Sequence, residues 1–307
     1  MKFRRFLIFC VVCVAMLPAN ALAKKPINVY VSILPQQYFV ERIAKEYARV
    51  QVLVKPGKNP STYSPSPDQI KRLTTSDIFF RIGVPFENGF LHKIEAISGA
   101  IQIVDTRKGI VLREMESHSH DQTDQTDPLD KVSGQETDHQ DPTGKDPHIW
   151  MSPLLVKIQA RTMATALMAF DPENTSAYEQ NLNQFLRDLD ALHERLITTL
   201  TPFQGETIFV FHPVFGYFTD TYGLNQMAIE TMGKAPRGKQ LSAIIKKAKS
   251  TNTRVLFVQP QFDQHAAQKI STAIKGSVVS IDPLAFDYLS NMETIAQAIG
   301  SNLSPLK

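Results

Sequence analysis

The sequence predicts an α/β protein of two lobes, each with a four-stranded parallel sheet flanked by helices, joined by one long linking helix. Short apolar, β-branched runs alternate with segments of helical periodicity, which is typical of parallel sheets with helices on their faces. This alternation occurs once before and once after a long helical pattern. The chain has 307 residues, enough for two domains that each bury a core.

The first 23 residues have the features of a secretory signal peptide. Lys2, Arg4 and Arg5 precede an apolar run, and Ala21-Leu22-Ala23 resembles a small-x-small cleavage site. The apolar run is too short to cross a bilayer, so a retained membrane anchor is the weaker alternative. We therefore expect cleavage after Ala23 and a periplasmic mature protein.

Charge and cysteine content exclude several classes of protein. Residues 1–23 hold three of the 33 Lys and Arg and none of the 30 Asp and Glu, so the mature chain carries 30 of each and has no basic excess for nucleic acid. Both cysteines, Cys10 and Cys13, lie in the signal, so the mature protein has no disulfide. No later segment approaches 18 apolar residues, which argues against stable membrane insertion.

Residues 24–170 are predicted to form the N-terminal lobe. Its strand candidates are 27–34, 50–54, 77–82 and 101–104. Helical patterns at 36–47 and 67–75 separate them, and Ser66 followed by Pro67 is a typical helix start.

Residues 114–147 interrupt this pattern. They hold ten acids, two lysines and three histidines, with almost nothing apolar. Such a segment cannot form a core, so we expect a mobile acidic loop.

A helix is expected at 153–170, and a longer one at about 173–200 carries apolar residues at spacings of three and four. Asp171-Pro172 marks its start, and we take 171–204 as the linking helix. Residues 205–307 then form the C-terminal lobe, with strand candidates at 206–211, 225–230, 254–258 and 277–281. Helical segments at 239–250 and 263–275 complete this lobe.

Polar residues that follow the predicted strands are the candidates for a binding site, because ligands of open α/β sheets bind at the carboxyl ends of the strands. These residues, together with one histidine that precedes the 153–170 helix, are Ser61, Tyr63, His212, Gln259, Asp282 and His148. Two imidazoles and one carboxylate suit a divalent cation such as Zn²⁺. Taken singly, His212 and Asp282 each precede proline and have a purely structural reading.

Five segments in this order resemble the metal-receptor family of periplasmic binding proteins, which serve zinc- and manganese-type ABC importers. They are PGKNPSTYSPSP, DPHIWMSP, FHPVFGYFTDTYGL, ETMGKAPRGKQL and IDPL. The acidic, histidine-bearing loop just before DPHIW is similar to that of the high-affinity zinc-uptake receptors within the family. The resemblance implies two α/β lobes around a rigid helix, with the metal in the cleft between them.

The resemblance implies that His148 and His212 are histidine ligands and that Asp282 is the carboxylate ligand. Two positions depart from the family pattern. Ser61 stands where the family places another histidine ligand, and Gln259 stands where many members, the manganese-type ones above all, carry glutamate. A neutral amide is a weak ligand for a hard cation, which argues against manganese.

The Ser61 replacement leaves one coordination position open. A water molecule could fill it, or a histidine from the acidic loop, for which His118, His120 and His139 are the candidates. Ordering a flexible loop would cost entropy. The loop is therefore either a solvated spacer or a weak zinc collector near the cleft.

The expected function is capture of Zn²⁺, before Mn²⁺ or Fe²⁺, and its delivery to an ABC-importer permease and its ATPase. We expect a monomer that is not an enzyme and that changes little on binding, because the long helix limits hinge motion. Two alternatives stay open: a receptor for a non-metal solute, since Ser61 replaces a ligand, and a metallohydrolase with Glu230 as its base.

Overall fold

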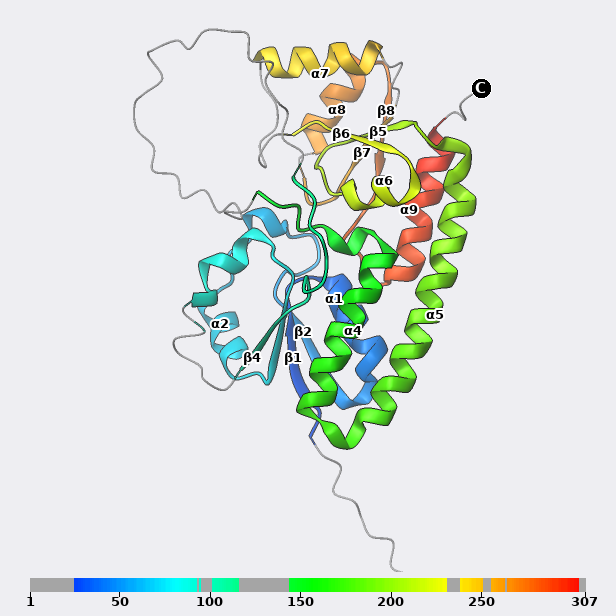
Figure 1. The fold of residues 1–307 in the computed structure, drawn as a ribbon. Coiled ribbons are helices and arrows are strands. Elements are labelled where there is room, and N and C mark those ends of the chain that lie inside the picture. Colours follow the sequence, from blue (N-terminus) through cyan, green and yellow to red (C-terminus); the bar gives the residue numbers. More distant parts are fainter. Residues whose placement is uncertain are drawn as a thin grey trace, which may run out of the picture.

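A computed structural model describes residues 25–92, 94, 101–115, 144–230, 238–250, 255–262 and 264–303. It contains two four-stranded sheets, both entirely parallel, which confirms the predicted fold class (Figure 1). The N-terminal sheet has the order β2-β1-β3-β4, and its strands are β1 (Ile27–Val31), β2 (Ala48–Val52), β3 (Ile78–Arg81) and β4 (Gln102–Asp105). The C-terminal sheet repeats this topology as β6-β5-β7-β8, with β5 (Thr207–Val210), β6 (Asn225–Ala228), β7 (Val255–Val258) and β8 (Ser277–Ser280).

Helices cover both sheets. The predicted ones are α1 (Leu34–Ala44), α2 (Pro67–Thr74), α4 (Pro153–Phe170), α5 (Thr175–Leu200), α7 (Gly238–Ser250) and α8 (Gln264–Ala273). Two further helices, α6 (Gly216–Tyr222) and α9 (Tyr288–Asn302), were not predicted. Along α9 the buried residues recur at Tyr288, Met292, Ile295 and Ile299, which is the spacing of one helical face.

The ends of α2 and α5 follow from their flanking residues. Ser66 caps α2 in a reciprocal capping box with Gln69, and Pro67 occupies the first turn, as predicted. Helix α5 begins two residues later than predicted, because Pro172–Asn174 forms a separate 3-10 turn. Buried Asp171 accepts hydrogen bonds from Asn174 Nδ2 and Tyr178 Oη at this junction.

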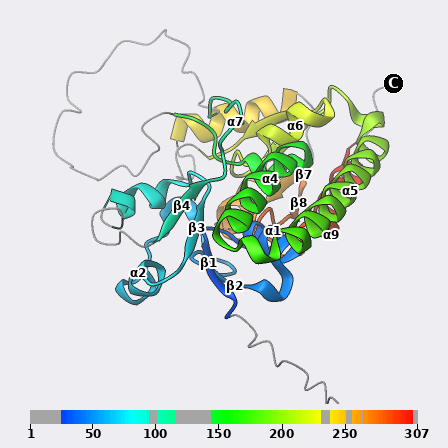
Figure 2. The same ribbon diagram turned by 60° about the horizontal axis from the view of Figure 1, so that its bottom comes forward.

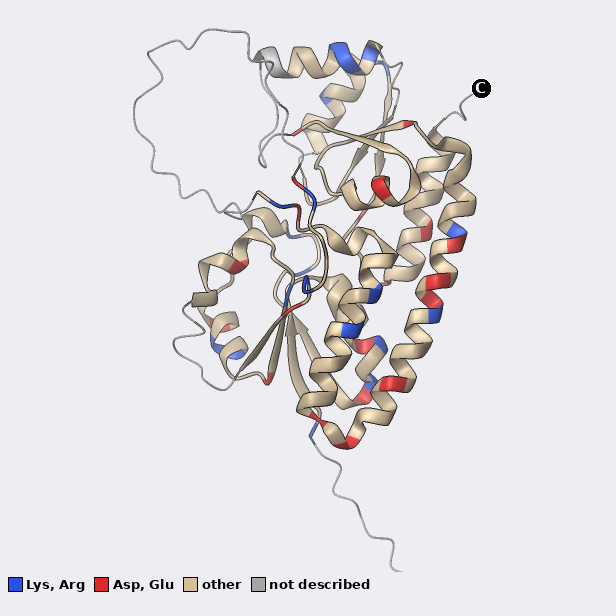
Figure 3. Ribbon diagram, in the orientation of Figure 1, with Lys and Arg blue, Asp and Glu red and all other residues tan. Residues whose placement is uncertain are grey.

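Helix α5 runs beside both lobes, with α9 alongside it in both views (Figures 1 and 2). Charged residues of both signs, with acidic ones in excess, lie along this helix (Figure 3). Its inner side buries a row of aromatic and aliphatic side chains, namely Tyr178, Leu182, Phe185, Leu186, Leu189, Leu192, Leu196 and Leu200. The apolar stripe of a typical amphipathic helix thus packs against helices α1, α4 and α9.

One hydrophobic core is continuous from the N-terminal sheet, along α5 and α9, into the C-terminal sheet. Successive side chains of β5 point to opposite faces of the C-terminal sheet. Ile208 and Val210 therefore join the shared core, whereas Phe209 lies in a smaller core under α7 and α8. Separating the lobes would therefore expose apolar surface.

The two ends of the predicted acidic loop, 114–147, are ordered, which corrects the expectation that the whole range is mobile. Glu114 and Lys145 form an antiparallel bridge and an ion pair, and Met115 N donates to Gly144 O at 2.9 Å. Asp146, which was assigned to the mobile loop, is 1% exposed. The range 114–147 was chosen by composition, which does not register such a backbone pairing.

The predicted signal peptide, residues 1–23, and the loop histidines His118, His120 and His139 lie outside the described residues. Within the parts of the chain that the structure does describe, we find no helix with the length and apolarity needed to span a membrane.

The side chain of Gln159 on α4 is fully buried, and within the described part of the chain neither of its amide atoms has a hydrogen-bond partner. Burying an unsatisfied amide costs about 1–3 kcal/mol. We expect Gln159→Met, which keeps the volume and removes the polar atoms, to raise the free energy of unfolding by about 1 kcal/mol in urea titrations.

Gln36 provides the matched control. It is equally buried, but its Oε1 accepts from Ser32 N at 3.0 Å and its Nε2 donates to Thr106 Oγ1 at 3.3 Å. Gln36→Met should lower the free energy of unfolding, because it leaves the buried Ser32 N unpaired and removes one of the two hydrogen bonds of Thr106 Oγ1. Equal effects of the two substitutions would contradict this account.

Candidate metal centre

Two of the predicted ligands meet in the structure. His148 Nε2 and His212 Nε2 lie 3.3 Å apart, and both residues are buried. His148 immediately precedes the 3-10 turn Ile149–Met151 that leads into α4, whereas His212 follows the end of β5 by two residues. The pair thus joins segments 64 positions apart in the chain.

A buried carboxylate orients each imidazole. Asp146 Oδ1 lies 2.7 Å from His148 Nδ1 and also accepts from the backbone N–H of His148 at 2.9 Å. Glu230 Oε1 makes a short hydrogen bond with His212 Nδ1. A histidine whose Nδ1–H donates to a carboxylate keeps the lone pair on Nε2, which is the arrangement common among metal-binding histidines.

The spacing of the two nitrogens fits one small cation. Two nitrogen ligands about 2.05 Å from a tetrahedral zinc ion lie roughly 3.3 Å apart. The two Nε2 atoms have this separation. Lone pairs facing each other at this distance repel unless a proton or a cation lies between them. The pair can therefore supply two of the four ligands of a tetrahedral ion.

The surroundings of His212 favour its neutral form. Burial lowers the pKa of His212, and its hydrogen bond to Glu230 opposes this only in part. The ring stacks on Phe262 with centroids 4.7 Å apart, and His148 lies edge-on to Trp150 at 5.2 Å. Neutral imidazole is the form that binds metal, so the aromatic surroundings prepare the site for a cation.

Gln259 is 1% exposed, and both ends of its amide are bonded to the backbone of His212. Its Oε1 accepts from His212 N at 3.2 Å, and its Nε2 donates to His212 O at 3.0 Å. A carboxylate could accept but not donate, so glutamine is the residue that satisfies both groups. Gln259 therefore positions His212, and its oxygen already accepts a hydrogen bond.

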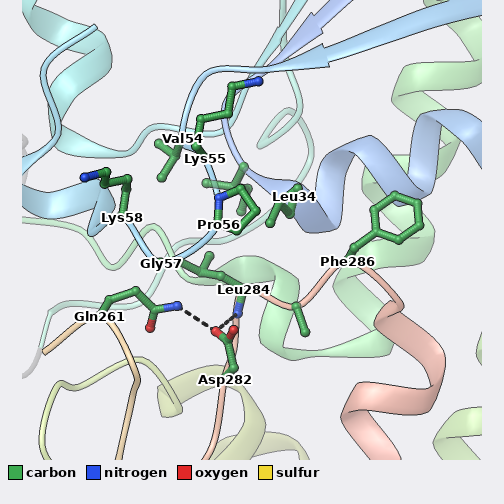
Figure 4. Close-up of a pocket in the computed structure, with 12 residues that line it drawn as sticks. Leu34, Val54, Lys55, Pro56, Gly57, Lys58, Gln261, Asp282, Leu284 and Phe286 are labelled. Atoms are coloured by element: carbon green, nitrogen blue, oxygen red, sulfur yellow. Dashed lines mark hydrogen bonds between the residues drawn. The ribbon is translucent and has the colours of Figure 1, made fainter. Parts of the chain in front are cut away.

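Asp282 lines a pocket of about 220 Å³ between the two lobes (Figure 4). Its Oδ1 accepts from Gln261 Nε2 at 2.8 Å and from Leu284 N at 3.0 Å. Trp150 Nε1 donates to Pro283 O at 2.9 Å, which ties the segment after His148 to the segment of Asp282. Among the residues that the structure describes, no three His, Cys, Asp or Glu side chains gather closely enough to hold a metal ion. The role of Asp282 as a ligand stays a prediction.

Ser61 lies half-buried in a 3-10 turn, Pro60–Thr62, after β2. The side chain of Asn59 accepts from Ser61 N at 2.8 Å, and Tyr63 Oη donates to Leu53 O at 2.6 Å. The ring of Tyr63 also packs edge-on against Phe86 at 5.2 Å. The segment is thus a supported loop, and a role of Ser61 at the metal stays a prediction.

The sequence reading missed the two orienting carboxylates. Asp146 was assigned to the acidic loop, although its position two residues before His148, with proline between, is a signal for such a contact. Glu230 was considered only as the base of a metallohydrolase. It ends the 225–230 run, so the strand-end rule that selected His212 also selects Glu230.

Comparison with known proteins gives a consistent result. The model of one protein family, described as the periplasmic zinc-uptake complex component A (ZnuA), matches residues 29–302. A high-affinity zinc uptake system protein of Yersinia pestis is 25% identical over 286 residues, covering 88% of each chain. A protein of Chlamydia muridarum described as a putative metal-binding protein is 26% identical and covers 88% of this chain and 90% of that one.

Solved structures agree with this match. A crystal structure of ZnuA superposes with a TM-score of 0.78 at 35% identity, covering 90% of this chain and 99% of that one. A deletion mutant of ZnuA with zinc bound gives a TM-score of 0.79 at the same identity, covering 92% and 100%.

The hydrogen bond between Glu230 and His212 generates a prediction. We expect Glu230→Gln to weaken zinc binding by about tenfold or more, the usual effect of losing a carboxylate that orients a ligand histidine. Competition titration against a chromophoric chelator measures this. Glu87→Gln is the control, because Glu87 is also a fully buried carboxylate but bonds Ser32 and the backbone of Ile82 and Gly83. If both variants weaken zinc binding equally, the effect of Glu230 is not specific to the site.

Proposed function

The chain belongs to the family of the periplasmic zinc-uptake complex component A, and on that premise we propose that it captures Zn²⁺ in the periplasm and delivers it to a membrane permease driven by an ATPase. Members of this family are solute-binding receptors, so the chain is a receptor and not an enzyme. We further propose that the protein acts as a monomer, that cleavage follows Ala23, and that residues 24–170, 171–204 and 205–307 are its N-terminal lobe, linking helix and C-terminal lobe.

The separation of 3.3 Å between His148 Nε2 and His212 Nε2 carries this proposal. It equals the spacing of two ligands on one tetrahedral zinc ion. Both nitrogens belong to buried imidazoles whose other nitrogen faces a carboxylate. This combination supports zinc over manganese, which favours carboxylate and water ligands.

We assign the third ligand to Asp282. Its carboxylate would have to exchange the hydrogen bond from Gln261 for the metal. Water or a histidine of the acidic loop, His118, His120 or His139, would complete the coordination. The bound amide of Gln259 argues against its use as a ligand.

Capture of the ion should involve only a small movement of the lobes. The shared core along α5 and α9 resists their separation, because opening would expose apolar surface. The rearrangement we propose is therefore local, at Asp282 and at the loop of Ser61. The outer surface that meets the permease would then differ only slightly between the metal-free and the metal-bound protein.

A receptor for manganese, iron or a non-metal solute is the second candidate, and the absence of the ligand histidine at Ser61 favours it. Elemental analysis of the purified mature protein separates these functions. Zinc at one equivalent supports our proposal, whereas manganese or iron in its place, or no bound metal after dialysis against zinc, overturns it.

The two histidines give the direct test of the site. We expect His148→Ala or His212→Ala to weaken zinc binding by more than about 100-fold, because loss of a ligand costs more than loss of its orienting partner. His193→Ala is the control, since His193 on α5 bonds Tyr222 Oη at 3.2 Å, away from the proposed ligands. Unchanged affinity in the His148 variant would remove the site assignment.

A substitution at Ser61 tests whether this residue stands in place of a ligand. If Ser61 stands in place of a ligand, Ser61→His should strengthen zinc binding by about tenfold or more, measured beside the parent protein in the same competition titration. Equal affinities would show that Ser61 is not a missing ligand.

A further inference from the structure

We propose that Arg113 is a positioning residue for metal binding, which holds the segments of His148 and His212 together so that their Nε2 atoms meet. The inference rests on the proposed function, since it concerns the same two histidines. Arg113 touches neither imidazole in any described contact, and its effect would pass through Asp146 and helix α6.

Arg113 first contacts the segment that carries His148, through Asp146. Arg113 O accepts from Asp146 N at 2.9 Å, and Arg113 Nη1 lies 3.8 Å from Asp146 Oδ2. The other oxygen of the same carboxylate, Oδ1, bonds His148. One buried carboxylate thus lies between the guanidinium and the imidazole, hydrogen-bonded to His148 and at ion-pair distance from Arg113.

Arg113 also contacts helix α6, which begins four residues after His212. Arg113 Nε lies 3.4 Å from Asp220 Oδ2, and the guanidinium carbon lies 5.9 Å from the centroid of the Tyr217 ring. Tyr217 Oη accepts from Arg113 N at 3.0 Å and donates to Asp146 O at 2.8 Å. Tyr217 thereby joins α6 directly to both Arg113 and Asp146.

Gly216 makes room for the guanidinium. A Cβ atom built on Gly216 would lie 1.3 Å from Arg113 Nη1 and 3.0 Å from Asp146 Oδ2. Any other residue at 216 would displace the arginine side chain. Helix α6 also packs against the turn Ile149–Met151 that follows His148, so the guanidinium lies where the two histidine-bearing segments come together.

These contacts matter because the metal geometry tolerates little error. Ligands must be held within about 0.5 Å of the productive geometry to keep full affinity. The segments of His148 and His212 belong to different parts of the chain, and Arg113 contacts both. The ion pair with Asp220 contributes little, because the Asp220 side chain is 61% exposed, whereas Asp146 is 2% exposed at its side chain and Arg113 only 22%.

The test uses Arg113→Met in the full mature protein, with zinc competition titration and the visible spectrum of the Co²⁺-loaded protein. We expect zinc binding to weaken by about tenfold or more. The d–d bands of Co²⁺ should also lose intensity, because a displaced imidazole distorts the tetrahedral site. A purely structural role would lower thermal stability without changing this spectrum.

Arg42→Met is the matched control. Arg42 is 28% exposed at its side chain, pairs with Asp188, and lies over the rings of Tyr38 and Phe185 at 5.7 and 5.1 Å. Its loss removes the same kinds of contact at a distance from the histidines. We expect Arg42→Met to affect stability and to leave zinc affinity and the Co²⁺ spectrum unchanged.

Gly216→Ala tests the inference without removing the arginine, and it serves if Arg113→Met does not fold. The added methyl should displace the guanidinium and weaken zinc binding as Arg113→Met does. The variant that carries both substitutions should bind zinc no more weakly than Arg113→Met alone. Parent-like zinc affinity and Co²⁺ spectra in Arg113→Met or Gly216→Ala would overturn the inference. If His148→Ala still abolishes binding in that case, the proposed function stands. If the parent protein itself binds no zinc, both fail.

Discussion

The shared hydrophobic core along α5 and α9 is the constraint on which the rest of the structure depends. It packs against the inner faces of both parallel sheets and continues from one lobe into the other. With the sheets fixed in this way, the segments after β5 and before α4 meet at a constant place, and His148 and His212 come from those two segments. Exposing this apolar surface to water would cost free energy in proportion to its area. The site therefore inherits its rigidity from the packing of the lobes.

Chemistry at the site is divided between the groups that face the ion and those that hold them. The imidazoles present Nε2 atoms, while Asp146 and Glu230 hold the opposite nitrogens and Gln259 holds the backbone of His212. The ring of Phe262 stacks on His212, and the ring of Trp150 packs edge-on against His148. In such surroundings each hydrogen bond is stronger than in water, and an unpaired polar group is costly. The arrangement suits a borderline cation that accepts neutral nitrogen ligands.

Much of the fold could be predicted from the sequence, because most strands, such as β1, β3, β5 and β7, are rich in apolar residues and α5 has a regular apolar stripe. Helix α6 was missed because it is seven residues long and almost wholly buried, so it shows no amphipathic period. The strand-end rule found His212 and Gln259 but did not indicate that the amide of Gln259 is bound to the backbone. Composition assigned Asp146 to a solvated loop, and only tertiary packing reveals it as buried. For Asp282 the strand-end rule predicted the position in the chain but not the direction of the carboxylate, which accepts a hydrogen bond from Gln261.

Gln259 has a consequence for how this site can change over generations. Its amide both donates to and accepts from the main chain of residue 212, and a carboxylate of nearly the same shape offers no donor. A single substitution to glutamate would leave a buried carbonyl unpaired and bring a negative charge beside it, which is destabilising before any new ligand is gained. A lineage that changes its metal by this route must therefore alter the backbone around His212 first, or at the same time.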